Sequence, residues 1–264
     1  MAGRLYLGTS GFAYPEWKGE FYPPDLKADA MLAFYARRLS SVEINYTFQN
    51  NPSDKVVGKW IADTPDGFVF SLKAHRAITH MFRLSPGAAG PMGELLTACG
   101  PLGRRLGAIF FQLPPNMKAD VPRLDAFLES LPPDRRYAFE FRHETWDTDA
   151  VRELLQAHDA AWCAADTDEI SCSLVRTAKD FAYLRLRKTV YEDEEVAGWA
   201  KQIGEVLAED ADVYCYFKHK DESRGVHFAL ALGAMLGVSV PSPAPVEPAL
   251  TLFPPETSEG PGGT

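Results

Sequence analysis

Residues 137–143 read Tyr-Ala-Phe-Glu-Phe-Arg-His, an aromatic run that becomes charged at its end. We expect a β-strand over 137–141, a helix over 149–157 and a second strand, built of small residues, over 161–165. Two strands separated by a helix are typical of a βαβ unit, in which the strands run parallel. The segment therefore predicts a parallel sheet that carries charged side chains near the carboxyl ends of its strands.

The same alternation continues on both sides of this segment. Strands are also expected over 4–9, 42–45, 68–72, 106–113, 182–186 and 213–217, and helices over 28–39, 52–61, 124–131, 194–208 and 226–236. Eight strands in about 240 residues fit a closed (β/α)8 barrel, or TIM barrel, better than an open doubly wound sheet. Residues 86–93 are loop-like in composition, so the unit between the third and fourth strands is expected to be irregular.

The bulk composition is that of one large globular domain. The chain has 264 residues, 46% of them hydrophobic and 24% charged, so a large core is feasible. The formal net charge is -9, which argues against a broad surface for nucleic acid or anionic membrane. A local basic pocket remains compatible with this balance.

The sequence shows no pattern of a metal or cofactor site. Cys99, Cys163, Cys172 and Cys215 form no Cys-x-x-Cys pair, and the histidines show neither His-x-His nor His-Glu-x-x-His spacing. A Gly-rich nucleotide fingerprint is also missing. The chain starts without a signal-peptide pattern, and no apolar stretch approaches the roughly 20 residues that span a bilayer. We therefore expect a cytoplasmic protein with reduced thiols, no metal, no cofactor and no membrane partner.

The composition changes near residue 238. Prolines recur from 241 to 261, and neither Lys nor Arg follows 238. We expect residues 1–237 to form the barrel domain and 238–264 to form a Pro/Gly-rich extended or disordered tail. The apolar segment 250–253 is the part of the tail suited to contact the barrel or a partner, but a tail that docks on neither is the favoured interpretation.

Polar and aromatic side chains gather at the carboxyl ends of the expected strands, where TIM barrels hold their active sites. In chain order the candidates are Thr9, Ser10, Trp17, Glu43, Asn45, Tyr46, Lys73, His80, Gln112, Glu140, Arg142, His143, Trp146, Asp166, Arg185 and Lys218. Side chains two positions apart on a strand share a face, so Glu140 and Arg142 are expected to point together. Structural ion pairs at the barrel rim are the alternative to a functional site, because buried charges need partners.

The residue types suggest acid–base chemistry. Glu43 and Glu140 are candidate general acid and base, and Lys73, His80 and His143 are further candidate catalytic groups. Hydrolase, lyase or isomerase chemistry fits these groups better than redox chemistry.

The remaining candidates are suited to bind a substrate. Lys73, Arg142, Arg185 and Lys218 would hold an anion, since guanidinium and ammonium groups bind carboxylates and phosphates. Gln112, together with Asn45, would orient hydroxyl groups. We therefore expect a small polar, anionic, sugar-like substrate. Trp17 belongs to an aromatic loop, 11–23, which would either wall the pocket or plug the barrel mouth.

Several of these stretches resemble domain-of-unknown-function family 72, the YecE-like proteins. The resemblance rests on 8–14 with Trp17, on Glu43-Ile44-Asn45-Tyr46-Thr47-Phe48, on Gln112-Leu113-Pro114 and on Glu140-Phe141-Arg142-His143 with Trp146. It extends in order from about residue 5 to 236 and implies a TIM barrel, but it implies no reaction.

The chain departs from the family pattern at two strand ends. The eighth strand continues as Lys218-His219-Lys220-Asp221 where the family favours an Asn-Asn-like pair, and Leu186-Arg187-Lys188 replaces a His-Gly continuation. Both changes add positive charge on the expected ligand face. Two further interpretations stay open: a nucleic-acid-processing barrel with endonuclease-like chemistry, and a ligand-binding or scaffold protein without turnover.

Overall fold

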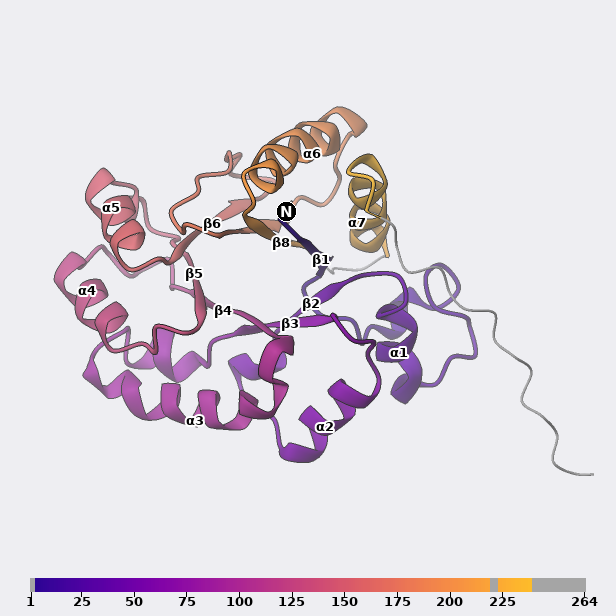
Figure 1. Ribbon diagram of the computed structural model, residues 1–264, viewed down its shortest axis with the longest axis horizontal. Helices are drawn as coiled ribbons and strands as arrows, with labels where there is room; N and C mark the ends of the chain where they lie inside the picture. The colour runs from indigo at the N-terminus through magenta and orange to yellow at the C-terminus, as the bar shows by residue number, and fades with distance from the viewer. Residues whose placement is uncertain (1–2, 219–222, 239–264) are drawn as a thin grey trace, which may run out of the picture.

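The computed structural model describes residues 3–218 and 223–238, which form a barrel of parallel strands surrounded by helices (Figure 1). The strands are β1 (Leu5–Thr9), β2 (Ser41–Ile44), β3 (Val69–Lys73), β4 (Leu106–Gln112), β5 (Arg136–Glu140), β6 (Ala161–Asp166), β7 (Phe181–Leu186) and β8 (Asp212–Phe217). Their spatial order is β1-β8-β7-β6-β5-β4-β3-β2, and all paired strands are parallel. The predicted (β/α)8 architecture is confirmed.

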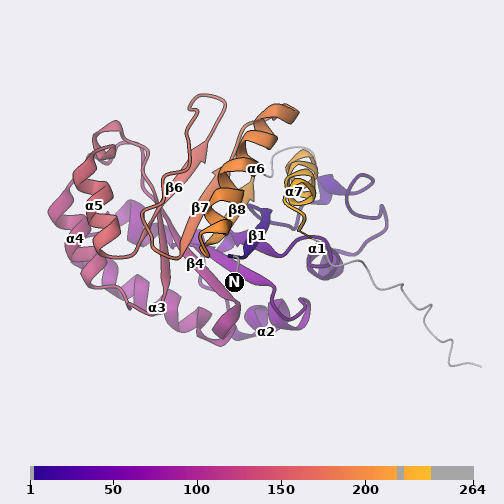
Figure 2. The ribbon, with the colours of Figure 1, turned by 45° about the horizontal axis from the view of Figure 1, so that its top comes forward.

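The helices lie outside the ring of strands (Figures 1 and 2). They are α1 (Met31–Tyr35), α2 (Asp54–Ala62), α3 (Ala89–Cys99), α4 (Val121–Glu129), α5 (Asp149–Ala157), α6 (Asp193–Ala208) and α7 (Arg224–Met235). Local chemistry sets where some of them begin: Glu192 and Glu195 form a capping box at α6, and the Thr148 hydroxyl caps α5. The helix expected over 28–39 is shorter, because a 3-10 turn at Ala28–Ala30 precedes α1.

The barrel closes between β1 and β2 through a narrow seam. Ser10 forms an isolated parallel bridge with Glu43, and the Gly11 amide donates to the Glu43 carbonyl at 2.9 Å. Gly8 makes this approach possible, because a Cβ at that position would lie 1.9 Å from the carbonyl oxygen of Ser41. The seam joins the first and last strands of the open sheet order into a ring.

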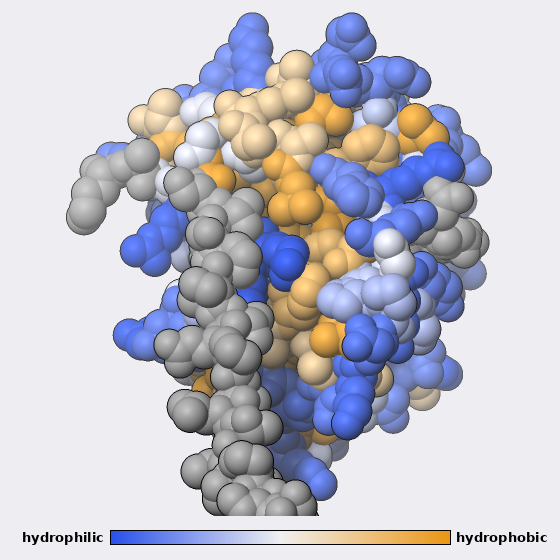
Figure 3. Space-filling model, turned by 90° about the vertical axis from the view of Figure 1, so that its right-hand side faces the viewer, coloured by the Kyte–Doolittle hydropathy of each residue, from blue (hydrophilic) through white to orange (hydrophobic). Residues whose placement is uncertain are grey.

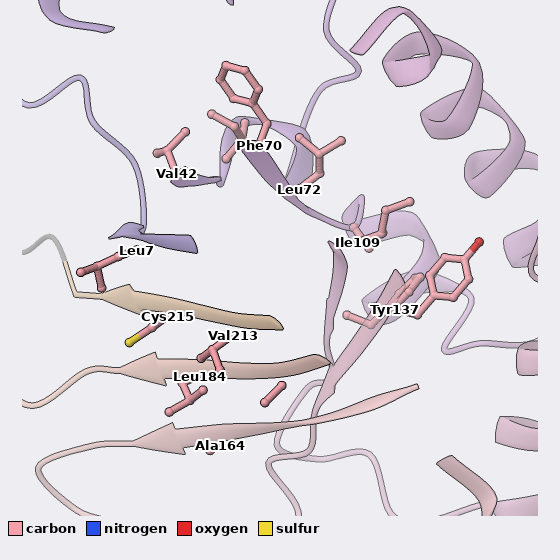
Figure 4. Packing of buried hydrophobic residues seen from close by; sticks show 14 of the residues in the cluster. Leu7, Val42, Phe70, Leu72, Ile109, Tyr137, Ala164, Leu184, Val213 and Cys215 are labelled. Carbon is pink, nitrogen blue, oxygen red and sulfur yellow. The ribbon is translucent and has the colours of Figure 1, made fainter. Parts of the chain in front are cut away.

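Two apolar layers hold the barrel. The larger lies between strands and helices, and Figure 4 shows part of it, including Leu72, Leu184 and Val213. The smaller fills the barrel interior, where Phe110 and Tyr183 stack with ring centroids 5.2 Å apart. Because side chains alternate along a strand, the residues two positions beyond Phe110 and Tyr183 also point inward, at the carboxyl end. The aromatic interior layer is therefore the floor beneath the polar strand ends.

Two of the connections between strands depart from a simple strand–helix repeat. Between β3 and β4 the chain forms a π-helix at Ala77–Met81 and a 3-10 turn at Pro86–Ala88 before α3 begins at Ala89. This unit is irregular at its start, as expected, although residues 89–93 belong to the helix. Between β6 and β7, residues 167–180 form no helix, and Figure 2 shows this connection as a long loop above β6.

The side of the molecule that carries α1 and α7 shows an apolar band bordered by hydrophilic residues (Figure 3). Phe34 of α1 and Phe228 of α7 are partly buried against the core. No helix within 3–218 and 223–238 is both long and apolar enough to cross a membrane. The predicted tail lies outside the described residues from 239 onward.

Candidate functional site

Three charged side chains from three strands that are not neighbours meet inside the carboxyl end of the barrel. Arg185 on β7 donates from Nε and Nη2 to the two carboxylate oxygens of Glu43 on β2, at 3.0 and 2.9 Å. Its Nη1 donates to Oε2 of Glu140 on β5 at 2.6 Å. The exposed fractions of the three residues are 1, 0 and 3%. The planar guanidinium fork thus joins β2, β5 and β7 across the barrel, and we call this group the Glu43–Arg185–Glu140 crossbar.

Hydrogen bonds extend the crossbar toward β3. Gln112 donates from Nε2 to Oε1 of Glu140 at 2.8 Å, and its Oε1 accepts from the amine of Lys73 at 2.8 Å. Arg142 also donates, from Nε, to Oε1 of Glu140 at 2.8 Å. The two ends of the Gln112 amide are therefore fixed by a carboxylate on one side and an amine on the other.

Both carboxyl groups of the crossbar are held in the ionised form. Burial alone would raise the pKa of Glu43, but Arg185 outweighs it and the pKa lies below the ordinary value. Burial acts in the same direction on Glu140, and Arg185 with Arg142 brings its pKa down to about 2. The two carboxylates in turn keep the pKa of Arg185 raised despite burial. The crossbar therefore keeps its charges at any pH near neutrality.

The amine of Lys73 lies in a different environment. It ends β3, its Nζ lies 4.3 Å from the ring centroid of Phe48, and it has no carboxylate within 4.0 Å among the described residues. Burial lowers the pKa of Lys73 to about 8, and the positive charge of Arg185 acts in the same direction. Within the polar cluster, Lys73 is thus a cation that can lose its proton close to neutral pH.

One further cation, Arg187, and the imidazole of His80 lie around this cluster. Burial lowers the pKa of Arg187, and the charge of Arg185 lowers it further. Its guanidinium has no hydrogen bond or ion pair to any residue in 3–218 or 223–238. The pKa of His80 is likewise lowered by burial and then by Lys73 and Arg142. The ring of His80 stands edge-on to Phe48, with centroids 5.1 Å apart.

Other predicted residues lie at the same end but outside this network. Ser10 is buried in the seam beside Glu43, and its Oγ has no hydrogen-bond partner among the described residues. Asn45 is half-buried and Tyr46 is exposed, directly after β2. His143 accepts from the Thr145 amide at 3.2 Å, which shapes the turn after β5.

The side of the mouth formed by β6, β7 and β8 carries its own charges. Asp166 is buried, and its Oδ2 lies 3.7 Å from Nζ of Lys188. Lys188 is also paired with Glu195 at 2.6 Å. Nζ of Lys218 lies 4.0 Å from Asp168. The residues after Lys218 in the predicted continuation (His219, Lys220 and Asp221) lie outside the described residues.

The structure does not bring three of the expected residues to the cluster. The Thr9 hydroxyl contacts Tyr35 and the Gly11 carbonyl instead of the barrel interior. Trp17 is fully buried against the rings of the loop that contains it, and this loop packs on α1 through Phe21 and Phe34. Trp146 is also fully buried, and its Nε1 donates to the Met117 carbonyl at 2.7 Å.

The structure also reveals residues that the sequence interpretation left out. The Tyr183 hydroxyl donates to Oε2 of Glu43 at 2.8 Å, and Arg185 lies over the ring of Phe110 at 4.5 Å. Strand parity could have found both, since each lies two positions before a residue of the site. Phe48 lies in a 3-10 turn after β2, where no periodicity signals its contact with Lys73.

The arrangement provides groups that are suited to charge recognition and proton transfer. No group of three or more His, Cys, Asp or Glu side chains in 3–218 and 223–238 is placed to hold a metal ion. Two carboxylates, Glu43 and Glu140, lie within the electrostatic reach of four cations, Arg185, Arg142, Lys73 and Arg187. The excess of positive charge suits an anion, and Lys73 and His80 can exchange protons beside it.

Comparison with solved structures shows proteins of the same shape. A DUF72 family protein from Thermotoga maritima matches 89% of this chain and 99% of its own, with a TM-score of 0.79 and 26% identity. A DUF72 family protein from Enterococcus faecalis V583 matches 89% of this chain and 96% of its own, with a TM-score of 0.74 and 16% identity, which supports the fold alone.

Sequence comparison agrees with the structural one. The UPF0759 protein YecE of Escherichia coli strain K12 is 32% identical over 140 residues, which is 53% of this chain and 48% of that relative. The same figures hold for its counterpart in Escherichia coli O157:H7. The matched region is therefore about half the length of these curated relatives. The model of the family described as protein of unknown function DUF72 matches residues 6–250. The chain therefore belongs to the DUF72 family.

Proposed function

We propose that this protein is an enzyme that binds a small, polar, anionic substrate at the carboxyl end of the barrel and transforms it by acid–base chemistry. A phosphorylated or carboxylated sugar-like molecule is the substrate class that suits the site. The observation that carries the proposal is the surplus of cations around the Glu43–Arg185–Glu140 crossbar: the guanidinium of Arg187 has no hydrogen bond or ion pair to a described residue, and the amine of Lys73 hydrogen-bonds only to a neutral amide. An anion would neutralise both.

Within this proposal the charged groups divide into two roles. Arg185 already donates to Glu43 and Glu140, so it serves as a support that holds both carboxylates and leaves the anion to Arg142, Arg187 and Lys73. Proton transfer falls to Lys73, whose pKa of about 8 suits a general base or acid near neutrality. His80 and His143 are the neighbouring candidates, and the two carboxylates, held ionised, would stabilise positive charge that develops on the substrate.

A thermal-shift comparison tests the anion site. Inorganic phosphate, glucose 6-phosphate and glucuronate are expected to raise the midpoint of unfolding, whereas glucose is not. A ligand at one hundred times its dissociation constant would stabilise the fold by about 3 kcal/mol. Ligands that show an effect are then followed by NMR for turnover, with Lys73→Met as the comparison.

Arginine substitutions at the two ends of the barrel provide the control for the phosphate effect. Arg187→Ala and Arg142→Ala should remove the shift caused by phosphate. Arg104→Ala should leave it unchanged, because Arg104 is 85% exposed and precedes β4 at the amino end. Equal phosphate shifts in all four proteins, wild type included, would contradict the proposed site.

A further inference from the structure

Lys73 differs from the other lysines at the mouth of the barrel. Lys188 pairs with Glu195 at 2.6 Å, and Lys218 lies 4.0 Å from Asp168. For Lys73 the nearby carboxylates, Glu43 and Glu140, are already bound to arginines, and its Nζ donates to the amide oxygen of Gln112. Its amine is thus held in a fixed position without an ion pair to any described residue.

On balance, the surroundings of this half-buried amine oppose a permanent positive charge. The ring of Phe48, with its centroid 4.3 Å from Nζ, and the charges of Glu43 and Glu140 favour the ammonium form. Burial removes the water that would stabilise the ammonium and, together with the charges of Arg185 and Arg142, it outweighs these groups and lowers the pKa of Lys73. A lysine that is desolvated beside other cations is the arrangement that activates an amine as a nucleophile.

The cations around Lys73 restrict which electrophile can reach it. Arg142 and Arg187 would hold an anionic group of the ligand, so the reacting carbon has to be a short distance from a carboxylate or phosphate. A carbonyl adjacent to such a group meets this condition, as in 2-oxo acids and ketose phosphates. We propose that Lys73 condenses with the carbonyl group of such an anionic substrate to form a covalent imine; this inference rests on the proposed function and names its substrate class.

The step balances without an external oxidant or reductant. The neutral amine attacks the carbonyl carbon, an N–C bond forms, and the carbonyl oxygen becomes the hydroxyl of a carbinolamine. That hydroxyl leaves as water when it takes up a proton, and a protonated imine with an N=C bond remains. The ammonium form of Lys73 plus the carbonyl compound thus gives the protonated imine plus water. The ionised Glu43 and Glu140 would stabilise the positive nitrogen.

Reduction by borohydride tests the imine directly. Full-length protein is incubated with pyruvate or with dihydroxyacetone phosphate, treated with borohydride, and measured by intact mass spectrometry and peptide mapping. A single reduced adduct on Lys73 is the expected result with at least one of the two probes. An adduct spread over other lysines, or none with either probe, would overturn the inference.

Two variants make the result specific. Lys73→Arg keeps the positive charge but cannot form an imine, so the adduct should fall to background while phosphate still stabilises the protein. Lys118→Arg changes an exposed lysine that follows β4 and should keep the full adduct. Phosphate stabilisation is measured in the same samples. If phosphate stabilises the protein but no adduct forms, the imine alone is refuted. If phosphate does not stabilise the protein and no adduct forms, the proposed function is refuted as well.

Discussion

Arg185 donates three N–H groups to Glu43 and Glu140, and this sharing determines what every other charged side chain of the site can do. The carboxylates remain ionised because the guanidinium lies between them, and the same guanidinium opposes a proton on Lys73. One buried cation therefore fixes two negative charges and weakens a third group's hold on its proton. Electrostatics of this kind are typical of functional sites.

The loss of unfolding free energy at acidic pH should reveal the contribution of the Glu43–Arg185–Glu140 crossbar to stability. The pKa of Glu140 in the folded protein is about 2, below its ordinary value of 4.5, so its contribution is complete above 4.5 and is lost as the pH falls toward 2. This difference corresponds to about 3 kcal/mol of unfolding free energy. Urea unfolding of wild type and Glu140→Gln at several pH values measures it. The acid-dependent loss should be smaller in Glu140→Gln, while Glu153→Gln, an exposed control, should keep the wild-type slope.

At the scale of elements, the seam between β1 and β2 closes the ring of strands. The other neighbouring strands pair along regular ladders, apart from a register shift between Phe70 and Leu72, whereas this junction depends on the Ser10–Glu43 bridge and on the close approach at Gly8. Glu43 belongs both to this seam and to the crossbar. Any change that separates the two strands will therefore also displace a carboxylate of the site.

Substitution of Gly8 by Ala tests this coupling. The added Cβ would lie 1.9 Å from the backbone carbonyl oxygen of Ser41, so β1 and β2 have to separate, and a loss of several kcal/mol, on the order of 3, is expected. Gly58→Ala is the matched control, because nothing lies within 4 Å of that position in α2. It should be neutral or stabilise the fold by up to about 1 kcal/mol. Denaturant unfolding distinguishes the two, and similar effects would contradict the seam's importance.

The sequence predicted which polar residues lie at the strand ends, but it did not predict which of them contact one another. Alternation and parity placed Glu43, Lys73, Gln112, Glu140 and Arg185 at one end of a parallel barrel. Contacts between β2, β5 and β7 depend on how the closed ring places strands that are not neighbours, which no local pattern encodes.

The aromatic loop 11–23 and helix α3 show the same limit. Trp17 is a residue type that is common in binding sites, but here its side chain is fully buried. α3 contains Gly90, Pro91 and Gly93, which suggest a loop, yet Pro91 lies in its first turn, where it is tolerated. Buried side chains such as Met92 and Leu95 stabilise the helix against this poor propensity.

At the scale of the whole molecule, the helical layer has a gap where β6 connects to β7. Residues 167–180 form no helix. The turn from Thr167 to Ile170 is stabilised by two hydrogen bonds: the Thr167 amide donates to the Ile170 carbonyl at 2.8 Å, and the Ile170 amide donates to the Thr167 hydroxyl. The Leu174 amide is bound to the Gln202 side chain at 2.9 Å instead of to a neighbouring turn. This side of the barrel therefore has less secondary structure over its strands than the side covered by α4 and α5.

Hydrogen exchange should detect this gap. Amides in 171–176 that lack backbone partners are expected to exchange far faster than those of β7, which pair with β6 and β8 along their length. Mass spectrometry of exchanged peptides measures the difference. Protection of 171–176 equal to that of β7 would show that the loop is as stable as the strands. A ligand that binds at the mouth, where Asp168 faces Lys218, should slow exchange in this loop.

The crossbar also has a consequence for how the chain reaches its fold during synthesis. Translation delivers Glu43 and Glu140 long before Arg185, so a nascent chain that ends after β5 has two carboxylates and no guanidinium to place between them. Both groups then favour water over the barrel interior, since an unpartnered buried charge is strongly destabilising. We therefore expect the first five strands to keep their polar ends in water until β7 emerges, so that completion of the barrel mouth waits for the arrival of a single arginine.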